Sequence, residues 1–389
     1  MEKEIQVDMT ALLSENIISA LGFTSEENYL NVKQGVSGLK RYTEHFEIPE
    51  PFMASEIDNG RLEAAFALIA PPTNQKYTKL EKASILSVHD ALKNTGINPS
   101  DKKVVFIFSS TKGNVFLLDE TERNGYEPEQ IYLWRSAELI AAFFGNKNNC
   151  LTVSNACISG LSALIIAQRA LLSGRCDYAI VVGADMLSKF AITGFQSFKA
   201  LSQEICKPFD VGRTGLNIGE AVATMILSRK NEAPDCNVEF TIAAGRNDAN
   251  HISGPSRTGE GSYLALKKVL ENIDIEDIAF INAHGTATLY NDEMEAISLT
   301  RAGLQNVPVN SLKGYFGHTL GAAGVLESII SARALKEGTV LKTYGFETLG
   351  VSTPLNIVKQ TITTDRKKHF IKLLSGFGGC NIAALYTLY

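Results

Sequence analysis

Short apolar strands alternate with amphipathic helices along this chain, and this alternation restricts its fold more than any other feature. Residues 81–94 have a helical pattern and are followed by an apolar strand at 103–109. A short strand at 150–154, a helix at 159–173 and an apolar strand at 178–183 come next. Such strands are typical of a parallel or mixed sheet whose two faces are covered by helices. The pattern therefore predicts an α/β fold.

The C-terminal part of the chain has a similar order of elements, without a convincing residue-level repeat. At 389 residues the chain is long enough for one large α/β domain or for two fused halves. A polar and charged segment at 229–236 fits a connection, so we expect halves at 1–232 and 233–389. The elements expected in the second half are strands at 238–243, 279–282, 369–374 and 382–388, and helices at 263–272, 292–302 and 322–336.

Charge and hydropathy argue against several classes of protein. The net charge of −5 argues against a nucleic-acid-binding protein, which needs a basic face to neutralise phosphates. The first ten residues lack the basic and then apolar pattern of a secretory signal. No uninterrupted apolar run reaches the roughly 20 residues that span a bilayer. We therefore expect a cytoplasmic protein without nucleic-acid or membrane partners.

Cys157 stands out among six cysteines that contain no CxxC pair. It lies in SNACISGLSAL, where a strand meets a helix, so the positive end of the helix dipole would stabilise its thiolate. Its neighbours Ala156, Ser159 and Gly160 are small enough to let a substrate approach. The pattern fits a reactive thiol, and it fits a buried packing cysteine equally well.

Two histidines and a glycine-rich turn lie near ends of other elements. His284 follows a strand in INAHGTATLY, which suits binding or acid–base chemistry but also fits a histidine that satisfies a turn. His318 lies in KGYFGHTLGAAG, whose glycines could simply mean close helix packing. In LLSGFGGCN, glycines flank Phe377, an arrangement that lets backbone amides face a ligand. No cluster has the ligand spacing of a metal site, so we expect no metal.

In this order, the four segments resemble the β-ketoacyl-acyl-carrier-protein synthase family of elongating ketosynthases, in the thiolase superfamily. The resemblance extends from about residue 104 to the C-terminus. It implies a thiolase-like fold, in which two similar α/β halves form a layered αβαβα core. It also implies a decarboxylative Claisen condensation of an acyl thioester with malonyl-acyl carrier protein, in fatty-acid, polyketide or polyene biosynthesis.

The resemblance assigns the catalytic roles residue by residue. Cys157 would accept the acyl group, and His284 and His318 would bind the malonyl thioester carbonyl and promote decarboxylation. Lys313 and Glu327 would hold the histidine network in place. These roles agree with the chemistry, because condensation needs a thiol that forms a thioester and donors directed at the enolate oxygen.

The substrate-binding roles are also implied by the resemblance. Thr286 and Thr288 would contact the phosphopantetheine arm of the acyl carrier protein, so no separate cofactor is expected. Phe377 would gate the site, and its amide and that of Cys157 would form the oxyanion hole. Gly378 belongs to the same substrate-binding turn.

Two lysines carry further expectations. Lys112, in SSTKGN, falls where the family has an apolar residue near the end of the acyl pocket. An unpaired buried ammonium costs several kcal/mol, so Lys112 should meet a polar acyl chain, a carboxylate of a facing subunit, or solvent. Lys199 is a candidate for docking the acidic carrier protein. The family also implies a homodimer or a heterodimer with a related subunit.

Other functions fit the sequence less well. The main alternative is a ketosynthase subunit that pairs with a chain-length partner in aryl-polyene-type pigment synthesis. A thiolase acting on coenzyme A thioesters lacks the motif around His318, and a non-catalytic chain-length partner normally lacks the cysteine at position 157. The chain also departs from the family: its first forty residues lack the usual opening strand, and Cys380 replaces a threonine.

Overall fold

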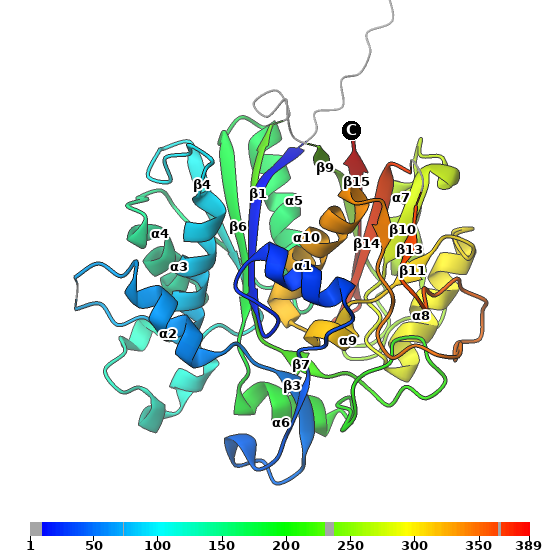
Figure 1. Ribbon diagram of the computed structural model, residues 1–389, viewed down its shortest axis with the longest axis horizontal. Helices are drawn as coiled ribbons and strands as arrows, with labels where there is room; N and C mark the ends of the chain where they lie inside the picture. Colours follow the sequence, from blue (N-terminus) through cyan, green and yellow to red (C-terminus); the bar gives the residue numbers. More distant parts are fainter. Residues whose placement is uncertain (1–9, 73, 230–236, 365–366) are drawn as a thin grey trace, which may run out of the picture.

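The computed structural model describes residues 10–72, 74–229, 237–364 and 367–389, and its main feature is one mixed sheet of ten strands (Figure 1). The strand order is β11-β10-β14-β15-β9-β1-β8-β6-β4-β5. In chain order the strands are β1 (Thr10–Ser19), β4 (Val104–Ser109), β5 (Leu151–Val153), β6 (Tyr178–Asp185), β8 (Ala221–Arg229), β9 (Val238–Asn247), β10 (Ile278–Asn282), β11 (Val309–Asn310), β14 (His369–Gly376) and β15 (Cys380–Leu388).

The sheet consists of two halves with the same strand plan. In the N-terminal half β4 pairs in parallel with β5 and β6, and β8 lies antiparallel between β6 and β1. In the C-terminal half β10 pairs in parallel with β11 and β14, and β15 lies antiparallel between β14 and β9. The halves join where β1 pairs with β9. The boundary expected between residues 232 and 233 lies outside the described residues.

Helices form the other layers of the molecule. Helix α3 (Lys79–Leu92) covers the outer face of the N-terminal half, and α7 (Glu260–Val269) with α8 (Leu289–Arg301) covers the outer face of the other half. Helices α5 (Ser159–Leu172) and α10 (Ala323–Lys336) lie between the halves. The result is the expected five-layer α/β core. None of the helices in the described ranges is long and apolar enough to cross a membrane.

The N-terminal region differs most from the sequence-based expectation. Its first residues lack the family's usual opening pattern, yet β1 is a central strand between β8 and β9. Its apolar residues Ala11, Ile17 and Ile18 suit this position, since all three are fully buried. Strand β8 was not predicted either. The remaining elements are α1 (Ser25–Lys33), β2 (Lys40–Tyr42), β3 (Phe52–Ser55), α2 (Asn59–Ala67), α4 (Leu133–Phe143), α6 (Lys189–Ser197), β7 (Ile218–Gly219), α9 (Lys313–Phe316), β12 (Thr339–Val340) and β13 (Ile362–Thr363).

The two central helices touch backbone to backbone at a pair of glycines. A Cβ atom on Gly324 of α10 would lie 2.5 Å from the amide nitrogen of Leu161 in α5. A Cβ atom on Gly160 would lie 3.0 Å from the carbonyl oxygen of Gly321. Close packing is therefore one function of the GAAG segment, and it brings the first turn of α5 against the first turn of α10.

We expect the Gly324→Ala substitution to destabilise the protein by about 1–3 kcal/mol, because the added methyl group meets backbone atoms that cannot rotate away. Urea unfolding measures this change. The matched control is Gly194→Ala in α6, where a Cβ atom would meet no atom within 4 Å. There we expect a stabilisation of less than about 1 kcal/mol, from helix propensity alone. Equal effects of the two substitutions would contradict the close crossing.

Candidate active site

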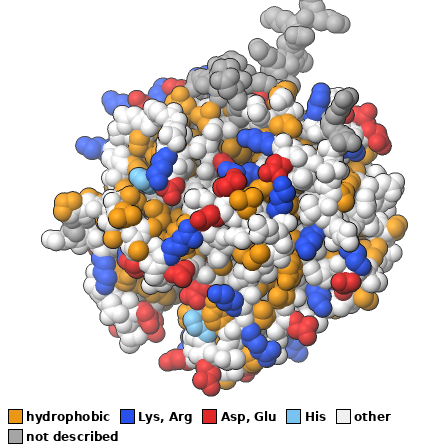
Figure 2. Space-filling view, in the orientation of Figure 1, with side chains coloured by type: hydrophobic (Ala, Val, Ile, Leu, Met, Phe, Trp, Pro, Cys, Tyr) orange, Lys and Arg blue, Asp and Glu red, His pale blue; other side chains and the backbone are white. Residues whose placement is uncertain are grey.

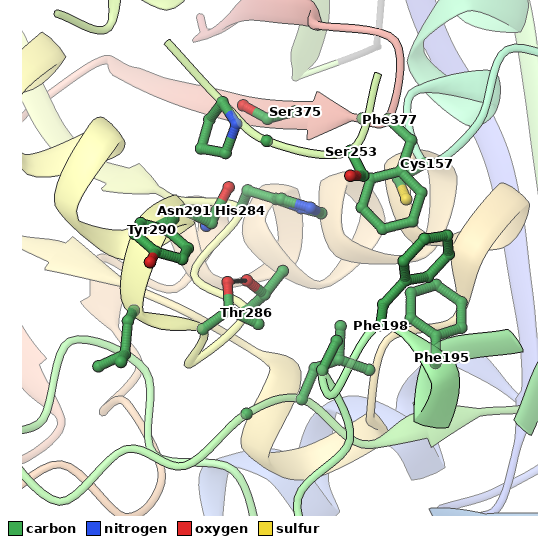
Figure 3. Close-up of a pocket in the computed structure, with 18 of the residues that line it drawn as sticks. Cys157, Phe195, Phe198, Ser253, His284, Thr286, Tyr290, Asn291, Ser375 and Phe377 are labelled. Carbon is green, nitrogen blue, oxygen red and sulfur yellow. Dashed lines mark hydrogen bonds between the residues drawn. The ribbon is translucent and has the colours of Figure 1, made fainter. Parts of the chain in front are cut away.

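A cavity of about 480 Å³ contains Cys157, His284 and His318 in its wall (Figure 3). Cys157 comes from the joint between β5 and α5, His284 from the end of β10, and His318 from the loop between α9 and α10. The three side chains are buried, and the thiol sulfur and one ring nitrogen of each histidine lie within 4.8 Å of one another. The fold thus brings together three predicted site residues that are far apart in the sequence.

A strained turn presents Cys157. Ala156 has a φ angle of +44°, which places a non-glycine residue in the left-handed region just before the cysteine. The Ser159 hydroxyl donates to the Ala156 carbonyl oxygen at 2.6 Å and accepts from the Asn155 amide at 2.8 Å. Ser159 therefore holds the turn from the first residue of α5.

Burial determines the resting state of the Cys157 thiol. It raises the pKa of Cys157 to about 12, although the charge of Lys313 and a hydrogen bond from the Phe377 amide oppose the shift. The helix end does not overcome this loss of solvation, so the sulfur is a thiol near neutral pH. Burial thus opposes the thiolate stabilisation expected from the helix end, and the thiol must lose its proton during the reaction.

The two imidazoles are the nearest groups that can accept that proton. Their ring centroids are 5.0 Å apart and the rings are nearly perpendicular, at 79°. Burial, followed by the charge of Lys313, holds the pKa of both His284 and His318 well below the usual 6.5. The Leu320 amide donates to Nδ1 of His318 at 3.3 Å, so the neutral ring of His318 has its proton on Nε2.

The same three side chains are the one group among the described residues that could hold a metal ion. A thiolate and two neutral imidazoles are common zinc ligands. The sequence predicts no metal, and this expectation stays a prediction.

Two carboxylates that sequence reasoning missed hold the His284 loop. Glu295 accepts the His284 and Gly285 amides at 2.7 Å, one with each oxygen. Asp292 accepts the amides of Phe209 and Ala287. Burial raises the pKa of Glu295 to about 7, with Asp292 as a second cause, and raises that of Asp292 to about 6. Two acids three residues apart, just after the histidine, are the signal that could have revealed them.

Lys313 and Glu327 form a buried ion pair behind the histidines, outside the cavity wall. Lys372 of β14 forms a second ion pair with the other oxygen of Glu327, at 2.6 Å. The two ammonium groups lower the pKa of Glu327 against the opposing effect of its burial. Sequence reasoning missed Lys372, although a lone lysine inside the apolar strand HFIKLL was a signal.

Aromatic side chains surround the mouth of the cavity. Phe377 is partly exposed, and its ring lies 5.8 Å from that of Phe195 and 5.4 Å from that of Phe198 (Figure 3). Nothing in the sequence singled out Phe195 of α6 and Phe198 just after it.

Gly378, with a φ angle of +88°, shapes the turn without lining the cavity. The Cys380 thiol donates to the Phe377 carbonyl oxygen at 3.4 Å, which fits the small packing residue expected there.

The other predicted binding residues lie along the same opening. Thr286 and Thr288 line the cavity, and their hydroxyl oxygens are 2.9 Å apart. Lys199 is exposed and lines both this cavity and a second hollow beside it. These positions agree with the expected binding roles, which stay predictions.

Lys112 is buried and pairs with a carboxylate of its own chain. Its ammonium group is buried and lies 2.9 Å from an oxygen of Asp185, which also accepts from Ser110, Thr111 and the Gly321 amide. A position at the surface is therefore wrong, and the carboxylate partner belongs to this chain. Lys112 is not among the described residues that line the cavity, so its role in an acyl pocket stays a prediction.

Comparisons with known proteins agree with this geometry. Residues 17–233 match the family described as β-ketoacyl synthase, N-terminal domain, and residues 239–347 match β-ketoacyl synthase, C-terminal domain. A putative polyketide β-ketoacyl synthase 1 of Streptomyces cyaneus is 30% identical over 264 residues, which cover 64% of this chain and 63% of the relative. This chain thus spans less than two thirds of that relative's length.

Two further proteins match along their whole length. A 3-oxoacyl-[acyl-carrier-protein] synthase 2 of Staphylococcus aureus (strain MRSA252) is 26% identical, and the alignment covers 100% of both chains. The structure of a ketosynthase in complex with its chain length factor from Xenorhabdus doucetiae superposes with a TM-score of 0.83. That match covers 100% of both chains at 24% identity and shows that the fold is the same.

The geometry predicts which thiol accepts an acyl group. A small acyl thioester that enters the cavity should acylate Cys157 before the other thiols, because neutral imidazoles within 4.8 Å can take up its proton. Peptide mapping by mass spectrometry would locate the acyl group. Cys157→Ala should abolish the modification, whereas Cys150→Ala, at a half-buried thiol outside the cavity, should leave it unchanged. Finding the acyl group on Cys380 would refute the assignment.

Proposed function

Because this chain belongs to the β-ketoacyl synthase family, we propose that it catalyses a decarboxylative Claisen condensation. An acyl group held on Cys157 would be joined to a malonyl group that an acyl carrier protein delivers. One observation carries the proposal: a buried thiol and two neutral imidazoles converge within 4.8 Å in the wall of one cavity. This is the set of groups that thioester exchange and enolate stabilisation require.

The first step transfers the acyl group to the enzyme. The Cys157 thiol attacks the acyl thioester, and its proton passes through a neighbouring imidazole to the leaving thiol of the carrier. The acyl–sulfur bond to the carrier breaks as the bond to Cys157 forms. The amides of Cys157 and Phe377 are the donors that would stabilise the oxyanion, because the Phe377 amide already faces the cysteine sulfur.

The second step releases carbon dioxide from the malonyl group. The Nε2–H of His318 and a ring N–H of His284 would donate to the thioester carbonyl oxygen as it becomes an enolate oxygen. Neutral donors suit this step, because an imidazolium would protonate the carbanion and end the reaction at an acetyl group. The buried, low-pKa environment of both rings supports this role.

The third step forms the carbon–carbon bond. The enolate carbon attacks the acyl carbonyl on Cys157, the carbon–sulfur bond breaks, and the sulfur regains a proton that a neighbouring imidazole relays from solvent. The product is a β-ketoacyl chain on the carrier protein, one carbon dioxide having been lost. No step requires an oxidant or a reductant.

An acyl carrier protein and a second subunit are the partners we propose. Strand β5 ends the ten-stranded sheet, so one of its edges is unpaired among the described strands and can receive a second subunit. A second copy of this chain and a related chain-length subunit both fit that position. The face shown in Figure 2 has interspersed acidic and basic side chains, so an acidic carrier would dock through a local basic patch.

A thiolase that acts on coenzyme A thioesters is a second candidate, and one assay separates the two functions. A thiolase condenses two acyl groups without releasing carbon dioxide. Release of labelled carbon dioxide from malonyl-acyl carrier protein would support the proposed synthase. Condensation of acetyl-coenzyme A without malonyl consumption would support the thiolase.

The histidine pair yields a direct test. His284→Ala and His318→Ala should each lower malonyl decarboxylation by about 100- to 1,000-fold, because each removes one donor to the developing oxyanion. Acylation of Cys157 should survive in at least one variant. His89→Ala on the outer helix α3 is the matched control and should decarboxylate normally. Normal decarboxylation in either site variant would remove that histidine from the mechanism.

A charge reversal tests the docking patch. Lys199→Glu should raise the KM for the carrier protein at low salt, since it adds repulsion beside the cavity mouth, and the effect should shrink as salt increases. Lys102→Glu is the control, because Lys102 is exposed just before β4, away from the lining of both hollows. An unchanged KM for the Lys199 variant at low salt would exclude this residue from the patch.

A further inference from the structure

Lys372 is a buried ammonium group for which the proposed chemistry has no task. It lies in the middle of β14 among apolar side chains and is fully buried. Its Nζ lies 2.6 Å from Glu327 Oε2, and it donates to the carbonyl oxygens of Ala283 at 3.1 Å and Asn282 at 3.3 Å. The ammonium group is thus held by one carboxylate and two backbone carbonyl oxygens.

Stability alone does not explain this lysine. Burying a charge costs several kcal/mol of solvation, and an apolar residue in place of a buried ion pair is often neutral or stabilising. Glu327 already has a cation, because Lys313 pairs with its other oxygen. Lys372 therefore brings a second positive charge to a carboxylate that one cation would neutralise. Burial, together with repulsion from Lys313, lowers the pKa of Lys372 to about 8 against the attraction of Glu327.

The contacts of Lys372 end at the peptide groups next to His284. Lys372 holds the carbonyls of Asn282 and Ala283, whereas Glu295 holds the amides of His284 and Gly285. A cation on the carbonyls and a carboxylate on the amides fix this short segment from both sides. The direction of the imidazole into the cavity depends on that segment.

Several charges face the histidine pair. Lys313 from α9 and Lys372 from β14 act on both rings, and Lys112 acts on His318. The carboxylates are Glu327 from α10, Glu295 and Asp292 from α8, and Asp185 from β6. Lys313, Glu327 and Lys372 together have a net charge of +1, which disfavours a protonated imidazole beside them.

We propose that Lys372 is a positioning residue of the histidine pair, which fixes the peptide groups before His284 and places a second buried positive charge beside both rings. The inference deepens the proposed function and rests on it. Its consequence is that the rings stay neutral at pH values where free histidine would be protonated. Neutral rings accept the Cys157 proton and do not quench the enolate.

The Lys372→Met substitution tests both parts of the role, because methionine keeps the length and removes the charge. The maximal condensation rate should fall by about 10- to 100-fold, with little change in the KM for malonyl-acyl carrier protein, because His284 is less well oriented. Without the charge, the pKa of both rings rises. The loss of condensation on acidification should therefore begin at a higher pH, by on the order of one unit.

Two further variants separate charge from structure. Lys368→Met removes an exposed charge just before β14 and should leave the pH profile unchanged. Lys372→Arg keeps a positive charge at this position, because a guanidinium stays protonated. Its condensation should slow through altered geometry, but the fall in condensation on acidification should begin at the same pH as in the unmodified chain. If condensation fell on acidification at the same pH in the unmodified chain and in Lys372→Met, the proposal would be overturned.

Nuclear magnetic resonance of histidine labelled with ¹⁵N in the ring tests the inference without any activity. In the unmodified chain the signals of His284 and His318 should remain those of neutral imidazole through pH 6.5. Titration of either ring at or above pH 6.5 would refute the inference, even if Lys372→Met does not fold. A chain with neutral rings that releases no carbon dioxide from malonyl-acyl carrier protein would refute the proposed function instead.

Discussion

The backbone contact between α5 and α10 is the constraint on which the rest of the site depends. Gly160 and Gly324 leave no room for a side chain at the crossing, so the two helices start almost in contact between the two half-sheets. Cys157 precedes α5, and the loop with His318 precedes α10. The nucleophile and one histidine therefore meet because two helices have glycine where they cross, and the second half-sheet brings His284 to the same point at the end of β10.

Buried charge is the second organising feature. The region behind the histidines contains Lys313, Lys372, Glu327 and Glu295, all buried. Such charges are costly to desolvate, and each one here is held by ion pairs or by backbone hydrogen bonds. Lys372 and Glu295 bind the peptide groups around His284. Burial, together with the charges of Lys313 and Lys372, holds the pKa of both imidazoles low. The molecule thus uses unfavourable burial to set the protonation state of its most reactive groups.

The nucleophile and the imidazoles depend on each other. Burial leaves Cys157 protonated at rest, with a pKa of about 12, so the thiol needs a base. The same burial lowers the pKa of both histidines and makes them available as bases and as neutral donors. One physical cause, the exclusion of water, therefore raises the pKa of the thiol and lowers the pKa of both imidazoles. Phe377, Phe195 and Phe198 form an aromatic cluster at the mouth of the same cavity.

Local sequence patterns were enough to predict the α/β class, the similar order of elements in the two halves, and Cys157, His284 and His318 as candidate site residues, because strand periodicity and motifs are local properties. These patterns did not show that β1 is a central strand. Whether a strand lies at the edge or the centre depends on which strands pair across the whole sheet. The sequence patterns also missed Lys372, Glu295 and Asp292, and they left Lys112 without its partner Asp185. Such pairings depend on the folded arrangement, because a buried charge is tolerated where distant segments supply its counter-charge. For the same reason the protonation states of Cys157 and the histidines follow from burial rather than from the adjacent residues.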